Sequence, residues 1–301
     1  MNLRDILSRE EFQSVTARNN WLGARIVLFD WLIIGGTFYL AATYPNPLVW
    51  IVAIFILGAR QLGLGIIVHE TGHRTLFTSP RLNDFVGNWL AGYFVFSNKD
   101  AYMRVHLKHH QEAGTDKDPD LANYVNYPIE RTSLRRKILR DITGQVGWRR
   151  IKSIVRAVSR LPELDPESRR FLLGSLGMNL GLLLVLAGTG HAALYLLWLI
   201  AFMTSHMLVS RIRQIAEHAA VPDLFDPDPR KNTRTLYINW LERLLIAPHH
   251  VNYHLEHHLM ASVPIYRLRQ LHELLLKKGF YGGVDFEYGY LRLLKRVTSA
   301  A

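Results

Sequence analysis

Four long apolar runs constrain the fold of this 301-residue chain more than any other feature. They cover residues 27–44, 48–68, 171–190 and 191–210. Each run approaches or exceeds the roughly 18–20 residues that a helix needs to cross a bilayer. Helices buried in a large soluble core are the alternative, but four such runs in two closely spaced pairs favour membrane spans. We therefore expect an all-α integral membrane protein, with four transmembrane helices in two hairpins and residues 1–301 forming a single domain.

Basic residues are distributed unevenly around these runs. The chain has 36 Lys and Arg against 25 Asp and Glu, yet the connectors Pro45–Pro47 and Gly188–Gly190 contain no Lys or Arg. Because basic residues concentrate in cytoplasmic loops, both termini and the region 98–170 are predicted to be cytoplasmic. This bias explains the net charge of +11 without nucleic-acid binding. The first 20 residues are polar and charged, which predicts no cleaved signal peptide.

The remaining segments predict a cytoplasmic helical cap. Residues 85–96 are apolar but too short to cross the membrane, which favours a re-entrant or interfacial segment. Residues 130–160 mix basic and aliphatic side chains at helical spacing and predict a helix lying near the membrane. A closing amphipathic helix is expected before Gly279, and its apolar stripe is Leu268, Leu271 and Leu275.

Nine of the fourteen histidines fall into four tight groups along the sequence. Three groups read HETGH, HLKHH and HLEHH, and a single histidine closes RIRQIAEH. On a helix these spacings put imidazoles on one face, while adjacent histidines point about 100° apart, so that one box can serve two ions. So many imidazoles exceed what one four-coordinate ion can use, which predicts more than one metal ion. The predicted ligands are His69, His73, His106, His109, His110, His218, His254, His257 and His258.

The donor types narrow the choice of metal. The chain has no cysteine, which excludes thiolate zinc sites and Cys-ligated iron–sulfur clusters. Imidazole suits Zn, Cu, Fe and Ni, whereas Mg²⁺ and Ca²⁺ prefer oxygen ligands. HETGH also matches the H-E-x-x-H signature of zinc hydrolases, in which Glu70 would be the general base. That alternative leaves the two HxxHH boxes unused, and a non-catalytic metal-binding membrane protein is a third interpretation.

The three boxes on a four-span chain resemble the membrane fatty acid desaturase superfamily. HLKHHQEAGTDKDPDLAN resembles the second box of that family with its trailing acidic stretch, and NYHLEHHL resembles the third. The resemblance implies a di-iron centre, two Fe ions held by the nine histidines, that uses O₂ to remove hydrogen from an unactivated alkyl chain. In the family an Asn four residues before the histidine equivalent to His218 holds a metal-bound water; this chain has Gln214 there.

The same resemblance implies a fatty acyl desaturase that introduces a double bond into a lipid acyl chain. A lipid or alkyl hydroxylase is the alternative, because both reactions begin with hydrogen removal. No Gly-rich dinucleotide motif follows a strand and no haem module is visible, so electrons are expected from an external ferredoxin-like or cytochrome-like donor. The substrate and the donor are therefore the expected partners, besides the membrane itself.

Several polar residues near the boxes are candidates for orienting the ligands. They are Glu70, Asp118, Glu217, Glu256 and His250. A solvated acidic turn is an equal alternative for Asp118, and the stretch 116–121 lacks the Gly that a calcium loop needs. We interpret His249 as a polar loop residue and His206 as a packed core histidine, and give no special role to His191 and His272.

Two further features concern charge. Arg60 lies inside a predicted span, where a charge is costly without a partner, and Asp30 in the neighbouring span is the predicted partner. The basic cluster Arg149, Arg150 and Lys152 suits an acidic donor or a lipid head group. The positive-inside bias alone predicts such a cluster, and we favour that explanation.

Overall fold

The computed structural model describes residues 3–299, and four helical segments within them are long and apolar enough to cross a membrane. These segments are Arg9–Thr43, Pro47–Gly72, Pro166–Gly188 and Ala192–His218. Their number and order confirm the prediction from the apolar runs. The helices extend beyond the runs, because polar residues continue them as far as capping side chains such as Asn19 and Asp165.

Helices dominate the described residues, as the sequence predicts. The α-helices are α1 (Arg9–Thr16), α2 (Asn20–Thr43), α3 (Pro47–Gly72), α4 (Pro80–Phe85), α5 (Lys99–Glu112), α6 (Arg131–Ile142), α7 (Gln145–Ser159), α8 (Pro166–Gly188), α9 (Tyr195–Met203), α10 (Ser205–His218), α11 (Pro229–Asn232), α12 (Trp240–Leu245), α13 (His254–Leu259), α14 (Leu268–Lys277) and α15 (Tyr290–Arg296). A π-helix, η2 (Val86–Ala91), and seven short 3₁₀ turns complete them: η1 (Leu3–Asp5), η3 (Gly92–Val95), η4 (Leu121–Asn123), η5 (Leu161–Glu163), η6 (Ala192–Leu194), η7 (Pro248–His250) and η8 (Ile265–Arg267). The strands are β1 (Ile129–Glu130), β2 (Leu236–Tyr237), β3 (Glu287–Tyr288) and β4 (Thr298–Ser299). They form two parallel two-residue pairs, β1 with β4 and β2 with β3, in which Ile129 faces Thr298 and Leu236 faces Glu287.

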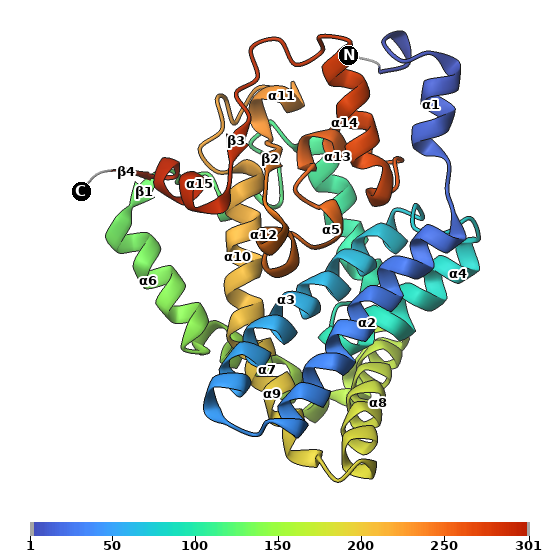
Figure 1. Cartoon of the computed structure of the whole chain (residues 1–301), viewed down its shortest axis with the longest axis vertical. Coiled ribbons are helices and arrows are strands. Elements are labelled where there is room, and N and C mark those ends of the chain that lie inside the picture. Colours follow the sequence, from blue (N-terminus) through green and yellow to red (C-terminus); the bar gives the residue numbers. More distant parts are fainter. Residues whose placement is uncertain (1–2, 300–301) are drawn as a thin grey trace.

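In Figure 1 the elements from α11 to α15, together with α5, lie at one end of the long helices α3 and α10. The connectors between α2 and α3 and between α8 and α9 lie together at the opposite end. We call α5 and residues 219–299 the cap; α4, η2, η3, α6 and α7 also lie outside the four long segments but are not part of it. All nine histidines of the boxes lie in the cap or at the ends of α3 and α10 next to it.

The fourth long segment is broken at Thr204, where φ is −119° and ψ is −87°. Ser205 follows the break and its hydroxyl donates to the carbonyl of Ile54 on α3, at 2.6 Å. A Cβ at Gly58 would lie 2.1 Å from the Ser205 Oγ, so only glycine permits this approach. The predicted continuation of this helix through RIRQIAEH is confirmed, since α10 ends at His218.

The short apolar segment 85–96 forms irregular helical turns instead of a regular helix. Asn179 of α8 donates to the carbonyl of Tyr93 at 3.1 Å. Arg150 of α7 donates to the carbonyls of Val95 and Phe96 at 3.0 and 3.2 Å. These donors satisfy carbonyls that the irregular backbone leaves unpaired, which is how such a segment is tolerated next to membrane spans.

Residues 130–160 form two helices, α6 and α7, where the sequence predicts one. Gly144 separates them with a φ of +78°, a left-handed conformation that suits glycine. The grouping of Arg149, Arg150 and Lys152 as one docking cluster is corrected, because Arg150 points inward and its guanidinium lies 4.9 Å from the ring centre of Phe202. Arg150 is therefore a structural residue.

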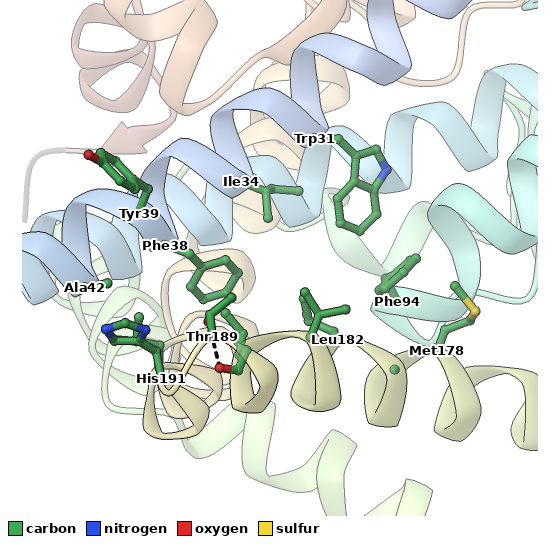
Figure 2. Close-up of a pocket in the computed structure, with 15 residues that line it drawn as sticks. Trp31, Ile34, Phe38, Tyr39, Ala42, Phe94, Met178, Leu182, Thr189 and His191 are labelled. Carbon is green, nitrogen blue, oxygen red and sulfur yellow. Dashed lines mark hydrogen bonds between the residues drawn. The ribbon is translucent and has the colours of Figure 1, made fainter.

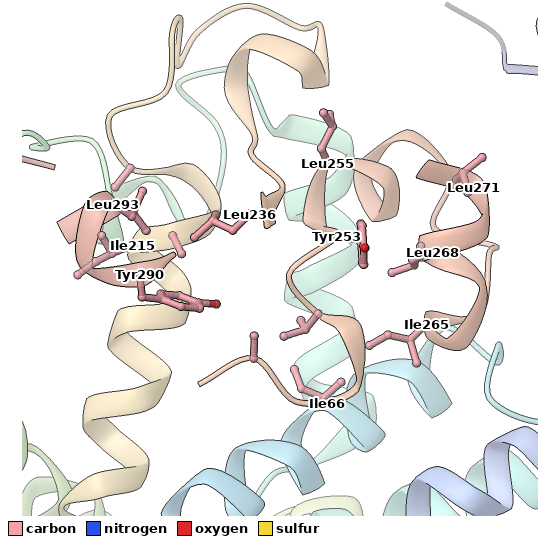
Figure 3. Packing of buried hydrophobic residues seen from close by; sticks show 14 of the residues in the cluster. Ile66, Ile215, Leu236, Tyr253, Leu255, Ile265, Leu268, Leu271, Tyr290 and Leu293 are labelled. Atoms are coloured by element: carbon pink, nitrogen blue, oxygen red, sulfur yellow. The ribbon is translucent and has the colours of Figure 1, made fainter. Parts of the chain in front are cut away.

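Buried apolar side chains form two cores. One joins α2, α3 and α9 through residues such as Ile34, Leu57 and Trp198. The other holds the cap together around the histidine-bearing helices, where Ile66 and Ile215 meet the cap (Figure 3). Leu268, Leu271 and Leu275 of α14 are buried in this second core, which confirms the predicted apolar stripe.

The predicted partner of Arg60 is confirmed. Its Nη1 donates to Asp30 Oδ1 at 2.7 Å, and both side chains are almost completely buried. Its second terminal nitrogen donates to the carbonyl of Leu244. Asp30 Oδ2 also accepts a hydrogen bond from His249 Nε2 at 2.9 Å. We call Asp30, Arg60 and His249 the triad.

Candidate metal centre

Helix α3 carries the first two histidines out of its apolar stretch. His69 lies in its last turn and His73 is its C-cap residue. Their ring centres are 4.6 Å apart. Arg74 follows in a left-handed conformation, with a φ of 59°, and turns the chain away. The end of α3 thus holds both imidazoles in place at the margin of the cap.

Three other helices bring the remaining seven histidines to the same place. Helix α5 starts at Asn98, whose side chain accepts hydrogen bonds from Asp100 N and Ala101 N, and it carries the second box. Helix α13 carries the third box, and α10 ends in His218. Helices α3, α5 and α10 contribute through their C-terminal turns, and α13 is only six residues long and mostly buried, so the cluster depends on how four helices pack.

The nine histidines form two groups of nitrogen atoms in the described part of the chain, and within each group these atoms lie within 4.8 Å of one another. The first group is His69, His73, His106, His110 and His257, and the second is His109, His218, His254 and His258. The adjacent pairs 109/110 and 257/258 are each divided between the two groups. Neighbouring histidines in one box therefore point into different groups, as their separation of about 100° on a helix predicts.

Unlike ordinary hydrogen-bonded histidines, these rings point their Nε2 atoms at one another. In the first group His106 Nε2 lies 2.8 Å from His69 Nε2 and 3.0 Å from His110 Nε2. His69 gives its Nδ1 hydrogen to Glu70, so its Nε2 is a bare lone pair when the ring is neutral. His106 Nε2 carries at most one hydrogen and cannot satisfy both neighbours. A cation placed among these lone pairs would remove the conflict.

The second group has the same conflict. His254 Nε2 lies 3.0 Å from His218 Nε2 and 3.1 Å from His258 Nε2. His218 Nδ1 donates to the carbonyl of Asn232 at 3.0 Å, which leaves its Nε2 as an acceptor. His254 Nε2 therefore faces an acceptor on one side and cannot also donate to His258. Both groups consequently fit metal ions by the chemistry and direction of their donor atoms.

Glu70 fixes the ring of His69. One carboxylate oxygen accepts from His69 Nδ1 at 2.9 Å. The other accepts from the Thr75 hydroxyl at 2.9 Å and from the backbone N–H of Ile265 at 3.0 Å. All of these bonds are buried, so Glu70 is occupied on both oxygens and does not face the convergent lone pairs.

Asp118 fixes the ring of His109 in the same way. Its Oδ1 accepts from His109 Nδ1 at 2.8 Å and from the backbone N–H of Asp120 at 2.8 Å. The hydroxyl of Tyr124 donates to Oδ2, and the Tyr124 ring stacks against His218 with a centre-to-centre distance of 4.9 Å. Burial raises the pKa of Asp118, but the hydrogen bonds from His109 and Tyr124 outweigh it, so this pKa lies below its ordinary value. The carboxylate therefore stays ionised and holds the His109 hydrogen on Nδ1.

Glu217 faces His254 but is further away. Its Oε1 lies 3.5 Å from His254 Nδ1. Arg213, one turn earlier on α10, donates to both oxygens of Glu217 at 2.5 and 2.8 Å. Arg213 and Glu217 are four positions apart on one helix, and this spacing in the sequence could have indicated the role of Arg213. Asn232 and Tyr124 have no comparable signal, because they reach the site from the ends of the short elements α11 and η4.

Five of the box histidines, His106, His110, His254, His257 and His258, are neutral near pH 7. Burial, reinforced by neighbouring histidines, lowers the pKa of His106, His254, His257 and His258 well below the ordinary value. The same causes lower the pKa of His110 to about 3. Neutral imidazole is the form that binds metal ions, so burial prepares these rings as ligands.

Two further predicted site residues, Gln214 and His250, line different cavities. Gln214 lines a polar cavity of about 120 Å³ together with His106, His109 and His218, so it borders the second group. Among the described residues no hydrogen bond joins His250 to any of the nine histidines; it lines a different cavity beside α2. The placement of His250 next to the ligands is therefore corrected.

Glu256 and His272 have other roles than the sequence predicts, because they bind each other. Glu256 accepts from His272 Nδ1 at 2.7 Å and from the Tyr281 hydroxyl at 2.5 Å, so it braces the back of α13 without contacting a box histidine. His272, which the sequence analysis leaves without a role, is thus part of a buried network. His249 belongs to the triad and is not a simple loop residue. His206 is confirmed as a core histidine, stacked 5.6 Å from the ring of Phe202.

An apolar cavity of about 650 Å³ lies between α2 and α8, away from the cluster (Figure 2). Trp31, Ile34 and Phe38 face it from α2, and Met178 and Leu182 face it from α8. None of the nine box histidines lines it. The cavity therefore belongs to the apolar helices and not to the candidate metal centre.

Four helices apolar enough to span a membrane and two groups of buried histidines define a metal-binding membrane protein. A family model described as fatty acid desaturase matches residues 45–288. This chain therefore belongs to the fatty acid desaturase family and is an oxidoreductase.

Three relatives illustrate the range of that family. The chain is 27% identical to the dihydrorhizobitoxine desaturase of Bradyrhizobium elkanii over 292 residues, covering 91% of this chain and 80% of that protein. It is 25% identical to a beta-carotene ketolase of Paracoccus sp. (strain PC1) over 251 residues, covering 80% and 87%. It is 29% identical to a chloroplastic sn-2 acyl-lipid omega-3 desaturase of Arabidopsis thaliana over only 97 residues, covering 32% and 22%.

Proposed function

We propose that this protein is an O₂-dependent membrane oxidoreductase with two iron ions, one in each histidine group, and that it desaturates an acyl chain. The observation that carries the proposal is the direction of the nine imidazoles, whose lone pairs converge on two adjacent points. The proposed ligands are the two groups defined above. The second ion would border the small cavity lined by Gln214, where a bound water is proposed.

When bound, a pair of iron ions supplies the redox chemistry that couples reduction of O₂ to removal of hydrogen from an unactivated C–H bond. The residues of the chain hold the ligands ready for it. Glu70 and Asp118 keep the hydrogens of His69 and His109 on Nδ1, so that each Nε2 stays free. The same arrangement argues against a zinc hydrolase, because both oxygens of Glu70 are occupied by other donors.

The number of ligands supports a pair of iron ions over a single zinc ion. The first histidine group offers five imidazoles and the second offers four. A structural zinc ion takes four ligands and a catalytic one takes three and keeps an open position, so a single zinc ion would leave most of these histidines unused.

Desaturation is the first choice and hydroxylation or another oxygenation is the alternative. The relatives include desaturases and a ketolase, and both kinds of reaction begin with hydrogen removal. We propose a lipid acyl chain as the substrate and an external ferredoxin-like or cytochrome-like donor as the source of electrons. The name of the Arabidopsis relative specifies ferredoxin and an acyl lipid, which supports both parts for this chain.

Metal analysis and product analysis test this function in sequence. Protein purified without oxygen should contain about two iron atoms per chain, as a di-iron protein does, and a single zinc per chain would overturn the proposal. Membranes supplied with O₂ and a reductant should then yield lipids lacking two hydrogens. Lipids that gain one oxygen would identify the alternative. A variant carrying His254→Ala provides the inactive control for both measurements.

We also propose that the cap and both termini face the cytoplasm, with the two short connectors outside. Because the chain has no cysteine, single cysteines can report this directly. Tyr44 lies in the connector between α2 and α3, Phe225 lies in the cap between α10 and α11, and both are exposed. A membrane-impermeant maleimide should label Tyr44→Cys in intact cells and Phe225→Cys only after permeabilisation; the reverse pattern would overturn this topology.

A further inference from the structure

A second cavity, of about 560 Å³, lies between the start of α2 and α12. Its size is within the range of small-molecule sites in proteins. Apolar side chains of α2 and α12 form its walls, including Leu22, Ile26 and Leu244, and two arginines, Arg25 and Arg243, line it as well. We call this cavity the arginine pocket. None of the nine box histidines lines it.

Within residues 3–299, neither Arg25 nor Arg243 forms an ion pair with an acidic side chain. The ion pairs that arginines form among the described residues all involve other side chains. Asp30, the buried acid of α2, is occupied by Arg60 and His249. A cavity that carries two uncompensated guanidinium groups between apolar walls is suited to an anion attached to an apolar chain.

Two polar atoms of the same pocket are buried without any partner in the described part of the chain. They are Arg243 Nε and His250 Nδ1. Buried polar atoms are rarely left unpaired, because each costs the hydrogen bond it made with water. Burial, followed by the charge of Arg243, lowers the pKa of His250 to about 4, so its ring is neutral near pH 7. The pocket therefore offers two fixed positive charges and unused hydrogen-bonding atoms.

Exposed tryptophans indicate that the pocket lies near the boundary between membrane and water. Trp240, which lines it, is 75% exposed, and Trp21 at the start of α2 is 69% exposed. Tryptophan is enriched at the boundary between membrane and water. A lipid-like molecule could thus enter the pocket directly from the bilayer surface.

Short connections join the arginine pocket to the candidate metal centre. Tyr266 lines the pocket, and the N–H of its neighbour Ile265 donates to Glu70, which accepts from His69. His249 and His250 both have left-handed backbone conformations, with φ of 58° and 68°, and their segment continues directly into the third histidine box. The triad holds this segment against α2 through His249.

We infer that the arginine pocket binds the carboxylate or phosphate head of a single-chain anionic lipid and thereby positions the substrate for oxidation. This inference rests on the proposed function and adds the charge of the substrate to it. Arg25 and Arg243 pair with the anion, His250 contributes a hydrogen bond, and the wall formed by Leu22 and Ile26 contacts the first methylenes. A neutral hydrocarbon would leave both arginines uncompensated.

Equilibrium binding to the purified, iron-loaded protein in a neutral detergent tests the inference. The probes are palmitate, hexadecyl phosphate and hexadecanol, which share one chain and differ in the head group. At least one anionic probe should bind about tenfold more tightly than hexadecanol, given the strength of charge-assisted hydrogen bonds. In Arg25→Gln/Arg243→Gln this preference should disappear while hexadecanol binding is unchanged.

Two controls make the result decisive. Arg156→Gln removes an exposed arginine of α7 that lies outside the pocket, and it should retain the preference. Arg25→Gln alone changes an exposed, unpaired side chain, so it should fold normally and weaken the preference in part. Equal binding of all three probes, or an unchanged preference in the double variant, would overturn the inference. Iron content and O₂-dependent product would still report separately on the proposed function.

Discussion

Helix α3 carries two buried polar sites, the triad around Arg60 and the histidine groups that begin at His69. His69 follows Arg60 by nine positions, or about 14 Å along the helix axis. In the triad, Asp30 accepts from both Arg60 and His249, so a carboxylate meets a guanidinium and an imidazole. In the histidine groups, neutral rings direct lone pairs at one another. The chain thus balances the first site with its own charges and leaves the second to be balanced by a cation.

This difference explains why the two sites need different surroundings. A buried ion pair is stable when most of its hydrogen-bonding capacity is filled. The carbonyl of Leu244 contributes to that for Arg60, whose Nε alone has no partner among the described residues. A metal site needs its ligands oriented and their other nitrogens occupied. Glu70, Asp118 and the carbonyl of Asn232 do this for three of the histidines. The triad is therefore expected to act in folding, and the histidine groups in metal binding.

Loss of a central histidine should give the largest effect. His106→Ala and His254→Ala each remove the ring that makes two close Nε2 contacts within its group. Activity should fall to background, and iron content should drop from about two atoms per chain to about one. Metal analysis of protein purified without oxygen measures this. His191→Ala, which changes an exposed histidine far from the boxes in sequence, should keep both irons; equal iron loss in that control would contradict the assignment.

Disruption of the triad should instead destabilise the fold and leave metal binding intact. Asp30→Ala leaves the buried guanidinium of Arg60 without its carboxylate, and Arg60→Ala leaves the Asp30 carboxylate with His249 as its remaining partner. Each should cost about 3–5 kcal/mol. The double variant should lose less than the sum of the two, because both charges are then absent. Thermal unfolding midpoints in one detergent measure the coupling. The exposed pair Arg269–Glu273 is a matched control that should show almost no coupling, and independent losses at Asp30 and Arg60 would contradict the triad.

Removal of a supporting carboxylate should have an intermediate effect confined to the metal site. Asp118→Asn replaces the acceptor that holds the Nδ1 hydrogen of His109 with an amide. Iron affinity or activity should fall about 10–100-fold, the usual effect of changing a ligand's hydrogen-bond partner. Titration of the iron-free protein with Fe²⁺ measures the affinity. Asp116→Asn changes an exposed aspartate in the same loop and should have no effect; similar losses in both variants would indicate a general loop effect.

Features encoded by neighbouring residues were predictable from the sequence, and those created by packing were not. The four apolar runs, the box histidines and the pairing of Asp30 with Arg60 follow from local periodicity and from the cost of a buried charge. The break at Thr204 depends on the contact of Ser205 with Ile54 and Gly58 of another helix. Likewise, the inward orientation of Arg150 and the link between His272 and Glu256 require distant segments to meet. The sequence indicated that adjacent histidines diverge, but only the packing of four helices decides which of them share a site.

The smallest predicted effect is that of removing a tyrosine hydroxyl next to the histidine groups, and it should differ between two tyrosines. Tyr124 and Tyr102 both stack on a box histidine, with ring centres 4.9 Å from His218 and 5.1 Å from His106. Of these two tyrosines, only Tyr124 forms a hydrogen bond through its hydroxyl to another described residue, and the acceptor is Asp118. Tyr124→Phe should therefore weaken iron binding by less than about tenfold, since Asp118 keeps its other two donors. Tyr102→Phe should leave iron affinity unchanged. Equal effects of the two substitutions would mean that ring stacking, and not the bond to Asp118, supports the site.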